Sequence, residues 1–421
     1  MAQNTEIPDD ELIVLDEKVL GSLGRQPTVN QVLSRFERGT YAIPISNHSI
    51  TLTPQQFLGK GGEGITYRSG DDLGAAVKLR PILSGLPPLP QFGEGPVPVA
   101  CSYHDGALEL QRLPSGPRAI IQDLRWEEQG AYRHAAAEQT ITHTCSGLPG
   151  AVEFLDGTYL LVVEERGSQL LAGLLTKLID GKTLSDHMKI GDLSLQEKLL
   201  IVAQVGDTLR EYQRRSIVHG DLKPRNIMID EGKRPTIIDH GISQLLLNEY
   251  KDLGHICGTP MYLAPEAAAN RFNRKTDFYS LGIIAYELLM GEHPYPANGI
   301  NGWNDNLHYF RLQGFFCDTV EAEKFCYRVR KALGERGYAP RLAWSIAGAL
   351  HGQPASRETS LPDVAREYAA LETSKRVQPP YTLNKGNTLW ETMPVKMEPD
   401  QTTLLELTEA MRLTGPELDV A

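Results

Sequence analysis

The sequence predicts an α+β fold in which short strands come first in the chain and long helices follow. From Ile50, the segments ITLTPQQFLGKGGEGITYRSG and GAAVKLR have the pattern of strand, glycine turn, strand, turn and strand. In LSLQEKLLIVAQVGDTLREYQRR apolar residues recur near the helical period, and SLGIIAYELLMG is apolar on nearly every face. Hydrophobic residues make up 41% and charged residues 23% of the 421 residues, which is ordinary globular composition and indicates that the chain folds.

The charge balance argues against broad binding to nucleic acid or to an anionic membrane. Lys and Arg number 42 against 53 Asp and Glu, which gives a net charge of -11. The acidic N-terminus MAQNTEIPDDELIV lacks a basic region followed by a long apolar stretch, and no later segment is apolar for long enough to span a bilayer. We therefore predict a cytoplasmic protein with no membrane span and no nucleic-acid partner; an effector secreted into a host cell is the alternative.

The elements follow one another in a definite order. Residues 81–117 are dense in proline and glycine, which cannot continue a helix or a central strand, so we expect an inserted loop there. A helix-compatible segment runs from Trp126 to about His143. Ser194 and Glu197 then have the spacing of a capping box and begin a second, amphipathic helix.

A glycine cluster in the first hairpin indicates a phosphate-binding turn. Gly59, Gly61 and Gly64 form G-x-G-x-x-G, and glycine is needed where backbone N–H groups must approach phosphate oxygens closely. The same pattern occurs in dinucleotide-binding turns, but there a helix must follow. Here the next residues resemble another strand, which favours a hairpin that covers phosphates.

Three later segments supply residues suited to phosphoryl transfer. Lys78 lies at the end of the next strand, where an ammonium can neutralise nucleotide phosphates. HGDLKPRN contains Asp221 to accept a hydroxyl proton, Lys223 near the transferred group, and Asn226 as a metal-binding amide. TIIDHG is an apolar strand that ends in Asp239, a carboxylate suited to Mg²⁺.

These motifs resemble those of the protein kinase superfamily, in its eukaryotic-like (Hanks-type) serine/threonine branch. The glycine segment, AVK, HGDLKPRN, DHG, GTPMYLAPE and TDFYSLG occur in the family's order. The resemblance implies a bilobal protein-kinase fold with a small β-rich N-lobe and a larger α-helical C-lobe. The implied regions are an N-terminal extension (1–45), a kinase domain (46–372) with an N-lobe over about 46–173 and a C-lobe over about 174–372, and a C-terminal tail with a short amphipathic helix (373–421).

The resemblance also implies a reaction and its cofactors. ATP would give its γ-phosphate to Ser or Thr hydroxyls of protein substrates, the chain itself among them, with Mg²⁺, or alternatively Mn²⁺, on the phosphates. Asp221 would orient the hydroxyl, Lys223 would neutralise developing charge, and Lys78 would align the triphosphate. Asn226 and Asp239 would bind the metal.

Further site residues follow from the same resemblance. Glu138 is the expected carboxylate partner of Lys78, because GLPGAV after it resembles the family's segment between this helix and the next strand. Glu127 and Glu128 are the alternatives. The residues expected around the adenine are Ala76 and Met228 on its faces, Thr176 as gatekeeper, and Lys177 to Ile179 as the hinge.

The resemblance implies supporting contacts as well, and the sequence departs from the family at Gly220, at His240 and at Thr66, where the family usually has valine. Glu266 should pair with a buried arginine, for which Arg357 is the candidate, and Asp277 should bind the catalytic-loop backbone. Gly220 replaces the arginine that usually precedes the catalytic aspartate, so activation by loop phosphorylation is less expected. His240 replaces the usual phenylalanine and brings polar atoms to a normally apolar place.

Two other functions compete with a protein kinase. A pseudokinase would bind nucleotide or partners as a scaffold, but it does not need Lys78, Asp221, Asn226 and Asp239 together. A small-molecule kinase is disfavoured by GTPMYLAPE, which resembles the protein-substrate branch. Under the kinase hypothesis, the 81–117 insertion precedes the helix of Glu138, so a regulatory partner that binds the insertion is expected to act on that helix.

Overall fold

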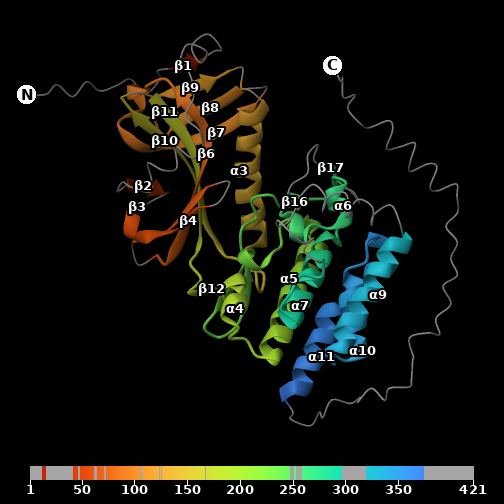
Figure 1. Ribbon diagram of the computed structural model, residues 1–421. Helices are drawn as coiled ribbons and strands as arrows, with labels where there is room; N and C mark the ends of the chain where they lie inside the picture. Colours follow the sequence, from red (N-terminus) through yellow and green to blue (C-terminus); the bar gives the residue numbers. More distant parts are fainter. Residues whose placement is uncertain are drawn as a thin grey trace, which may run out of the picture. The chain divides into compact units, whose positions relative to one another are not determined.

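A computed structural model describes most of the chain from strand β1 to helix α11 (Figure 1). The described residues are 12–15, 41–45, 48–60, 64–70, 73–104, 107–122, 124, 126–165, 167–246, 251–252, 258–295 and 319–373. Strands dominate the first half of this part and helices the second half, which confirms the predicted mixed α+β fold with a β-rich N-terminal lobe and a helical C-terminal lobe.

Among the described residues, the N-terminal lobe is built on a nine-stranded sheet. Neighbouring strands are antiparallel except for the edge pair β1 and β9, which is parallel. In spatial order the strands are β1 (Leu12–Leu15), β9 (Arg118–Ile121), β8 (Ala107–Arg112), β7 (Gly95–His104), β10 (Phe154–Glu164), β11 (Gly167–Lys177), β6 (Ala75–Leu86), β5 (Ile65–Arg68) and β4 (Phe57–Lys60). A separate hairpin lies between β1 and β4 in the chain and is formed by β2 (Tyr41–Ile45) and β3 (His48–Leu52).

The expected loop over 81–117 is wrong, because these residues continue β6 and form all of β7 and all of β8, and β9 begins directly after them. Prolines are tolerated in β7 because they lie where the strand is paired on one side only. β7 pairs with β10 at its beginning and with β8 only from Val99 onward, so Pro96 and Pro98 precede the second pairing. The carbonyl of Pro98 accepts from Leu113 N on the β8 side, so its ring nitrogen also points away from β10 and no ladder hydrogen bond is lost.

Helix α3 (Trp126–Cys145) lies along this sheet, as the prediction of a helix from Trp126 requires (Figure 1). Its N-terminal half packs on the inserted strands. The ring of Tyr132 on α3 stacks on Tyr159 of β10, with ring centroids 5.8 Å apart, and lies tilted against Tyr103 of β7 at 6.0 Å; its hydroxyl donates to the carbonyl of Cys101. The inserted strands therefore share one hydrophobic core with α3, β1, β10 and β11 and contribute to the position of α3.

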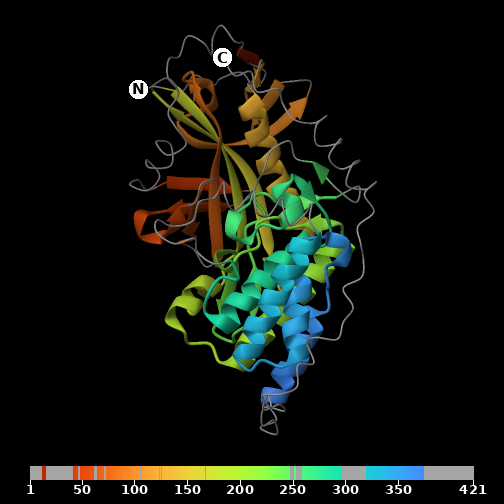
Figure 2. The same ribbon diagram turned by 45° about the vertical axis from the view of Figure 1, so that its right-hand side comes forward.

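The C-terminal lobe is a group of helices around one large core (Figure 2). The helices are α4 (Leu184–Ile190), α5 (Leu195–Arg214), α6 (Pro265–Ala268), α7 (Thr276–Met290), α9 (Thr319–Glu335), α10 (Pro340–Ala349) and α11 (Leu361–Thr373). The predicted capping box is present, because Ser194 Oγ accepts from Glu197 N and the Glu197 carboxylate accepts from Ser194 N. Helix α7 is buried on every face and ends before Gly291, whose φ is 75°, also as predicted.

Short strands between these helices position the chemistry-bearing segments. They are β12 (Gly181–Thr183), β14 (Ile227–Asp230) and β15 (Pro235–Ile237) in one sheet, β13 (Ile217–Val218) with β16 (Gln244–Leu245), and β17 (Lys251–Asp252) with β18 (Arg271–Phe272). Single 3₁₀ turns occur at Pro54–Gln56, Pro90–Phe92, Pro224–Asn226, Pro260–Tyr262 and Pro354–Ser356.

The ends of the predicted domain scheme are described only in part. In the expected N-terminal extension, 12–15 and 41–45 are strands, and the rest lies outside the described residues. The same holds for the expected tail beyond Thr373. β11 continues to Lys177, past the expected end of the N-lobe at about 173. Among the residues that the structure describes, no helix combines the length and the apolarity needed to cross a bilayer.

Candidate active site

Strand β6 and helix α3 bring together the first charged group of the site. Along β6, Ala76, Lys78 and Arg80 share one face of the strand, opposite to a buried face. Lys78 Nζ lies 2.6 Å from Oε1 of Glu138, which projects from α3, and Arg80 Nη1 lies 3.4 Å from Oε2 of the same carboxylate. Of the three glutamates considered for Lys78, Glu138 is thus the one in contact with it; the side chain of Glu127 lies outside the described residues.

Lys78 also reaches the other lobe. Its Nζ lies 2.7 Å from Oδ1 of Asp239, which follows β15. Burial by itself would lower the pKa of Lys78, but the carboxylates of Glu138 and Asp239 outweigh it and raise this pKa above its ordinary value. Burial would likewise raise the pKa of Asp239, but the Lys78 ammonium reverses this and lowers it below the usual range. Both groups are therefore charged at neutral pH.

The loop between β13 and β14 carries Asp221, Lys223 and Asn226. Lys223 Nζ donates to Oδ2 of Asp221 at 2.5 Å, and Asn226 Nδ2 donates to the Asp221 carbonyl at 2.9 Å. Thr259 contacts both ends of this group: its hydroxyl donates to Oδ1 of Asp221 at 2.6 Å and accepts from Lys223 Nζ at 2.8 Å. The aspartate is therefore fixed at both oxygens, beside an ammonium.

Asp277 of helix α7 holds the backbone of this loop, as predicted. Its carboxylate accepts from His219 N at 2.7 Å and from Gly220 N at 2.9 Å. Gly220 has a φ of 79°, a conformation that glycine adopts without strain and other residues rarely do. The glycine that departs from the family pattern therefore suits the backbone observed here.

Asp239 and His240 lie between the two lobes. Asp239 has a φ of 66°, which an aspartate tolerates better than most residues. The imidazole of His240 is buried between α3 and α5: Nδ1 lies 3.3 Å from Oγ1 of Thr142 and Nε2 lies 2.8 Å from the hydroxyl of Tyr212. Burial, with a smaller contribution from His219, lowers the pKa of His240 to about 3, so this imidazole is neutral.

The oxygen atoms near Lys78 and Asp221 fit a Mg²⁺ ion that is shared with phosphates. In the described part of the chain, no hydrogen bond uses Oδ1 of Asn226 or Oδ2 of Asp239. The backbone joins the two, because Ile238 N donates to the Asn226 carbonyl at 2.9 Å. No group of three or more His, Cys, Asp or Glu in these residues could hold a metal alone. One carboxylate and one amide suffice for Mg²⁺ when phosphates and water supply the other ligands.

The residues expected around a nucleotide lie on β6, at the end of β11 and on β14. Ala76 of β6 pairs with Thr176 of β11, and Met228 is half-buried on β14. In the expected hinge, Lys177 N donates to the Glu153 carbonyl. No hydrogen bond among the described residues uses the backbone of Ile179, so its N–H is available to a ligand.

The glycine segment is described in part. Gly59 in β4 has open space where a Cβ would be, whereas a Cβ on Gly64 would lie 2.4 Å from the carbonyl oxygen of Leu79. Gly61 lies outside the described residues.

The predicted supporting ion pair is present. Arg357 donates to both oxygens of Glu266, at 2.6 and 2.7 Å, and neither side chain is exposed. Asn273 Nδ2 and Thr276 Oγ1 also donate to Glu266, at 3.1 and 3.0 Å. Bidentate geometry and additional donors are what a buried ion pair requires.

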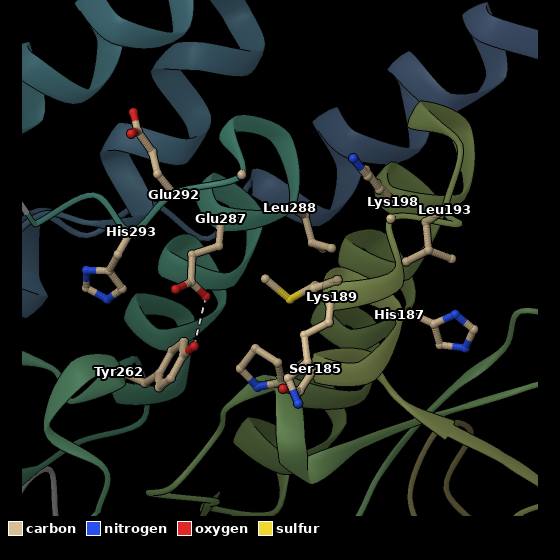
Figure 3. Close-up of a pocket in the computed structure, with 14 residues that line it drawn as sticks. Ser185, His187, Lys189, Leu193, Lys198, Tyr262, Glu287, Leu288, Glu292 and His293 are labelled. Carbon is tan, nitrogen blue, oxygen red and sulfur yellow. Dashed lines mark hydrogen bonds between the residues drawn. The ribbon is translucent and has the colours of Figure 1, made fainter.

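A cavity of about 330 Å³ borders the catalytic loop at Pro224 (Figure 3). Figure 3 shows Glu287 of α7 on one side of it and Lys189 of α4 and Lys198 of α5 on the other. The hydroxyl of Tyr262 donates to Glu287 at 2.9 Å. Burial raises the pKa of Glu287 to about 7, and the hydrogen bond from Tyr262 opposes this only in part.

Sequence reasoning missed several groups that contact the site. Thr259 lies in GTPMYLAPE, the recognisable motif that could have pointed to it. Arg80 shares a strand face with Lys78 and could have been found by that alternation. Thr142, Tyr212 and Glu287 carry no local signal, because each is a single polar residue in an ordinary helix.

Comparisons with known proteins agree with this geometry. The model of the family described as "Protein kinase domain" matches residues 122–338, more than half of the chain. The match begins just before α3, so the glycine segment and Lys78 precede it.

Similar curated proteins include several kinases. The serine/threonine-protein kinase PknA of Mycobacterium tuberculosis is 33% identical over 136 residues, which are 32% of this chain and 32% of that protein. Calcium-dependent protein kinase 5 of Plasmodium falciparum is 35% identical over 138 residues, 32% of this chain and 23% of that protein. The serine/threonine-protein kinase pkn2 of Myxococcus xanthus is 30% identical over 132 residues, 30% of this chain and 16% of that protein. The chain thus spans a third or less of the length of these relatives.

Proposed function

The chain belongs to the protein kinase domain family, and on this premise we propose that it transfers the γ-phosphate of ATP to Ser or Thr hydroxyls of protein substrates, the chain itself among them. The observation that carries the proposal is the ion pair of Lys78 with Glu138 and Asp239, which joins the β-rich lobe, α3 and the strand end after β15 at one point. A triphosphate needs cationic alignment and a metal at the same place, and the oxygens of Asp239 and Asn226 lie on that side. Serine/threonine specificity is supported by the names of the relatives and by Lys223 beside Asp221.

The residues divide the work in the following way. Asp221 accepts the hydrogen bond of the substrate hydroxyl, and Lys223 and Thr259 restrict it to one orientation. Lys78 aligns the phosphates. A bound Mg²⁺ held by Asn226 and Asp239 would neutralise charge on the phosphate oxygens. Ala76, Met228 and the Ile179 N–H would contact the adenine.

A regulatory partner at the 81–117 insertion is a further part of the proposal. The inserted strands pack on α3 through Tyr103 and Tyr132, so a protein bound there would act on the helix that carries Glu138. The cavity beside Pro224 is available to a protein substrate, because it borders the loop of Asp221 and is lined by the carboxyl of Glu287. The cytoplasmic location stays a prediction.

A direct assay tests the proposed function. The purified full chain is incubated with ATP, Mg²⁺ and a generic protein substrate, and phosphate is located by mass spectrometry. We expect phosphoserine or phosphothreonine with the unmutated chain and a loss of at least about 10²-fold with Asp221→Asn, because a positioned general base contributes about that much. Asp239→Asn should abolish transfer as well.

The matched control is Asp207→Asn, which removes an exposed carboxylate on α5 that pairs with Arg366. It should retain full transfer. Phosphate transfer that survives Asp221→Asn and Asp239→Asn would refute the proposal. ATP binding without any transfer would favour the pseudokinase.

A further inference from the structure

A continuous series of buried hydrogen bonds connects the two lobes through His240. The hydroxyl of Tyr212 on α5 lies 2.8 Å from Nε2, and Nδ1 lies 3.3 Å from Oγ1 of Thr142 on α3. Thr142 Oγ1 in turn lies 2.7 Å from the backbone carbonyl of Glu138. Tyr212, His240, Thr142 and Glu138 are all buried, so water does not compete for these bonds.

The number of protons fixes the direction of each bond. A threonine hydroxyl has one proton, and Thr142 donates it to the Glu138 carbonyl, which has none. Thr142 can therefore only accept from His240, so the neutral imidazole carries its proton on Nδ1. Nε2 then has a lone pair and accepts from Tyr212. Every donor in the series has an acceptor, so this polar group is stable inside the core.

The series ends at the residue that pairs with Lys78. Thr142 lies four residues after Glu138 on α3, so the two side chains share one face of the helix. A directional hydrogen bond at Thr142 restricts the rotation of this helix face. An apolar side chain at position 240 could fill the same space, but it could not orient the helix. Other contacts also fix α3: Gln139 Nε2 donates to the Gly173 carbonyl at 3.0 Å, and Arg80 contacts Glu138. The contribution of His240 is therefore one of several.

We propose that His240 is a positioning residue whose two hydrogen bonds tie α3 to α5 and thereby orient Glu138 toward Lys78. The inference rests on the proposed function, because it concerns the alignment of the same lysine. It assigns a purpose to the histidine that stands in place of the family's usual phenylalanine.

A set of near-isosteric substitutions tests the series. His240→Phe keeps an aromatic ring but removes both bonds, Thr142→Val removes one hydroxyl at nearly constant volume, and Tyr212→Phe removes the other. Each should lower kcat/KM for ATP by about tenfold or less, the factor that one or two hydrogen bonds supply. The double variant His240→Phe with Thr142→Val should be no worse than His240→Phe alone, because both act on one series.

The matched control is Thr140→Val. Thr140 lies on the exposed face of the same helix and makes the same kind of bond, from its hydroxyl to the Ala136 carbonyl at 2.8 Å. It should leave kcat/KM unchanged. If Thr142→Val behaves like Thr140→Val, or if the effects of His240→Phe and Thr142→Val multiply, the proposal is overturned. If His240→Phe does not fold, Thr142→Val, Tyr212→Phe and their double variant are compared instead. Effects on kcat/KM that multiply in that double variant would again overturn the proposal.

A second readout does not depend on catalysis. In ¹⁵N spectra of the histidine side chains, His240 should show a protonated Nδ1 and an unprotonated Nε2, and Thr142→Val should shift the Nδ1 signal while Thr140→Val does not. A proton on Nε2 would refute the series. Absence of phosphate transfer in the unmutated chain would refute the proposed function instead. The series of hydrogen bonds through His240 would then be tested by these spectra and by the melting temperatures of His240→Phe, Thr142→Val and their double variant, compared in the same way.

Discussion

Removing Arg357 should expose how much the C-terminal lobe depends on its buried ion pair. In Arg357→Met the Glu266 carboxylate loses the two charged donors at 2.6 and 2.7 Å and keeps only neutral donors, Asn273 and Thr276. Because neither ionic side chain is exposed, water cannot replace the lost guanidinium. An uncompensated buried charge of this kind lowers the free energy of unfolding by about 3–5 kcal/mol.

The assay is urea unfolding of the full chain, followed by tryptophan fluorescence and far-ultraviolet circular dichroism. The double variant Glu266→Gln with Arg357→Met should be more stable than Arg357→Met alone, because it removes the unpaired charge. Arg341→Met is the matched control, since Arg341 pairs with Glu367 on the nearby α10 and α11 with both side chains exposed, and it should change the unfolding free energy by no more than about 0.5 kcal/mol. A loss in Arg357→Met as small as that in Arg341→Met would show the reasoning to be wrong.

Two more predictions concern the cavity and the glycine segment. The pKa of Glu287 is raised by burial from 4.5 to about 7, so the stability that this carboxyl contributes is complete below pH 4.5 and is lost as the pH rises through 7. Glu287→Gln, which can still accept from Tyr262, should therefore unfold at higher urea than the unmutated chain at pH 8, by up to about 3 kcal/mol, and parallel pH profiles of the two proteins would contradict this. Gly64→Ala should lower the unfolding free energy by about 1–3 kcal/mol, because its Cβ would lie 2.4 Å from the Leu79 carbonyl oxygen. Gly59→Ala, with no atom within 4 Å of its Cβ, should leave the melting temperature unchanged, and equal losses in the two variants would argue against the close contact.

Local signals in the chain were sufficient for much of the helical lobe. The capping box of Ser194 and Glu197 involves atoms three residues apart, and the end of α7 at Gly291 follows from one residue type. The inserted strands were missed for the opposite reason. Whether a proline can lie in β7 depends on which partner faces its nitrogen, and the partners β10 and β8 are chosen by the whole sheet.

The order and chemical nature of the groups follow from the chain alone: an ammonium after a glycine hairpin, then a carboxylate, an ammonium and an amide in one short loop, then a carboxylate at a strand end. Which of these groups meet depends on how the lobes pack. Lys78 contacts Glu138 and Asp239, which are 60 and 161 residues away, and His240 contacts Thr142, which is 98 residues away. Sequence patterns report on neighbours within a helical turn or a strand pair, whereas these contacts depend on how α3 packs against the sheet and α5. The residue types of the site can therefore be predicted from the sequence, whereas their contacts follow from the packing of the two lobes.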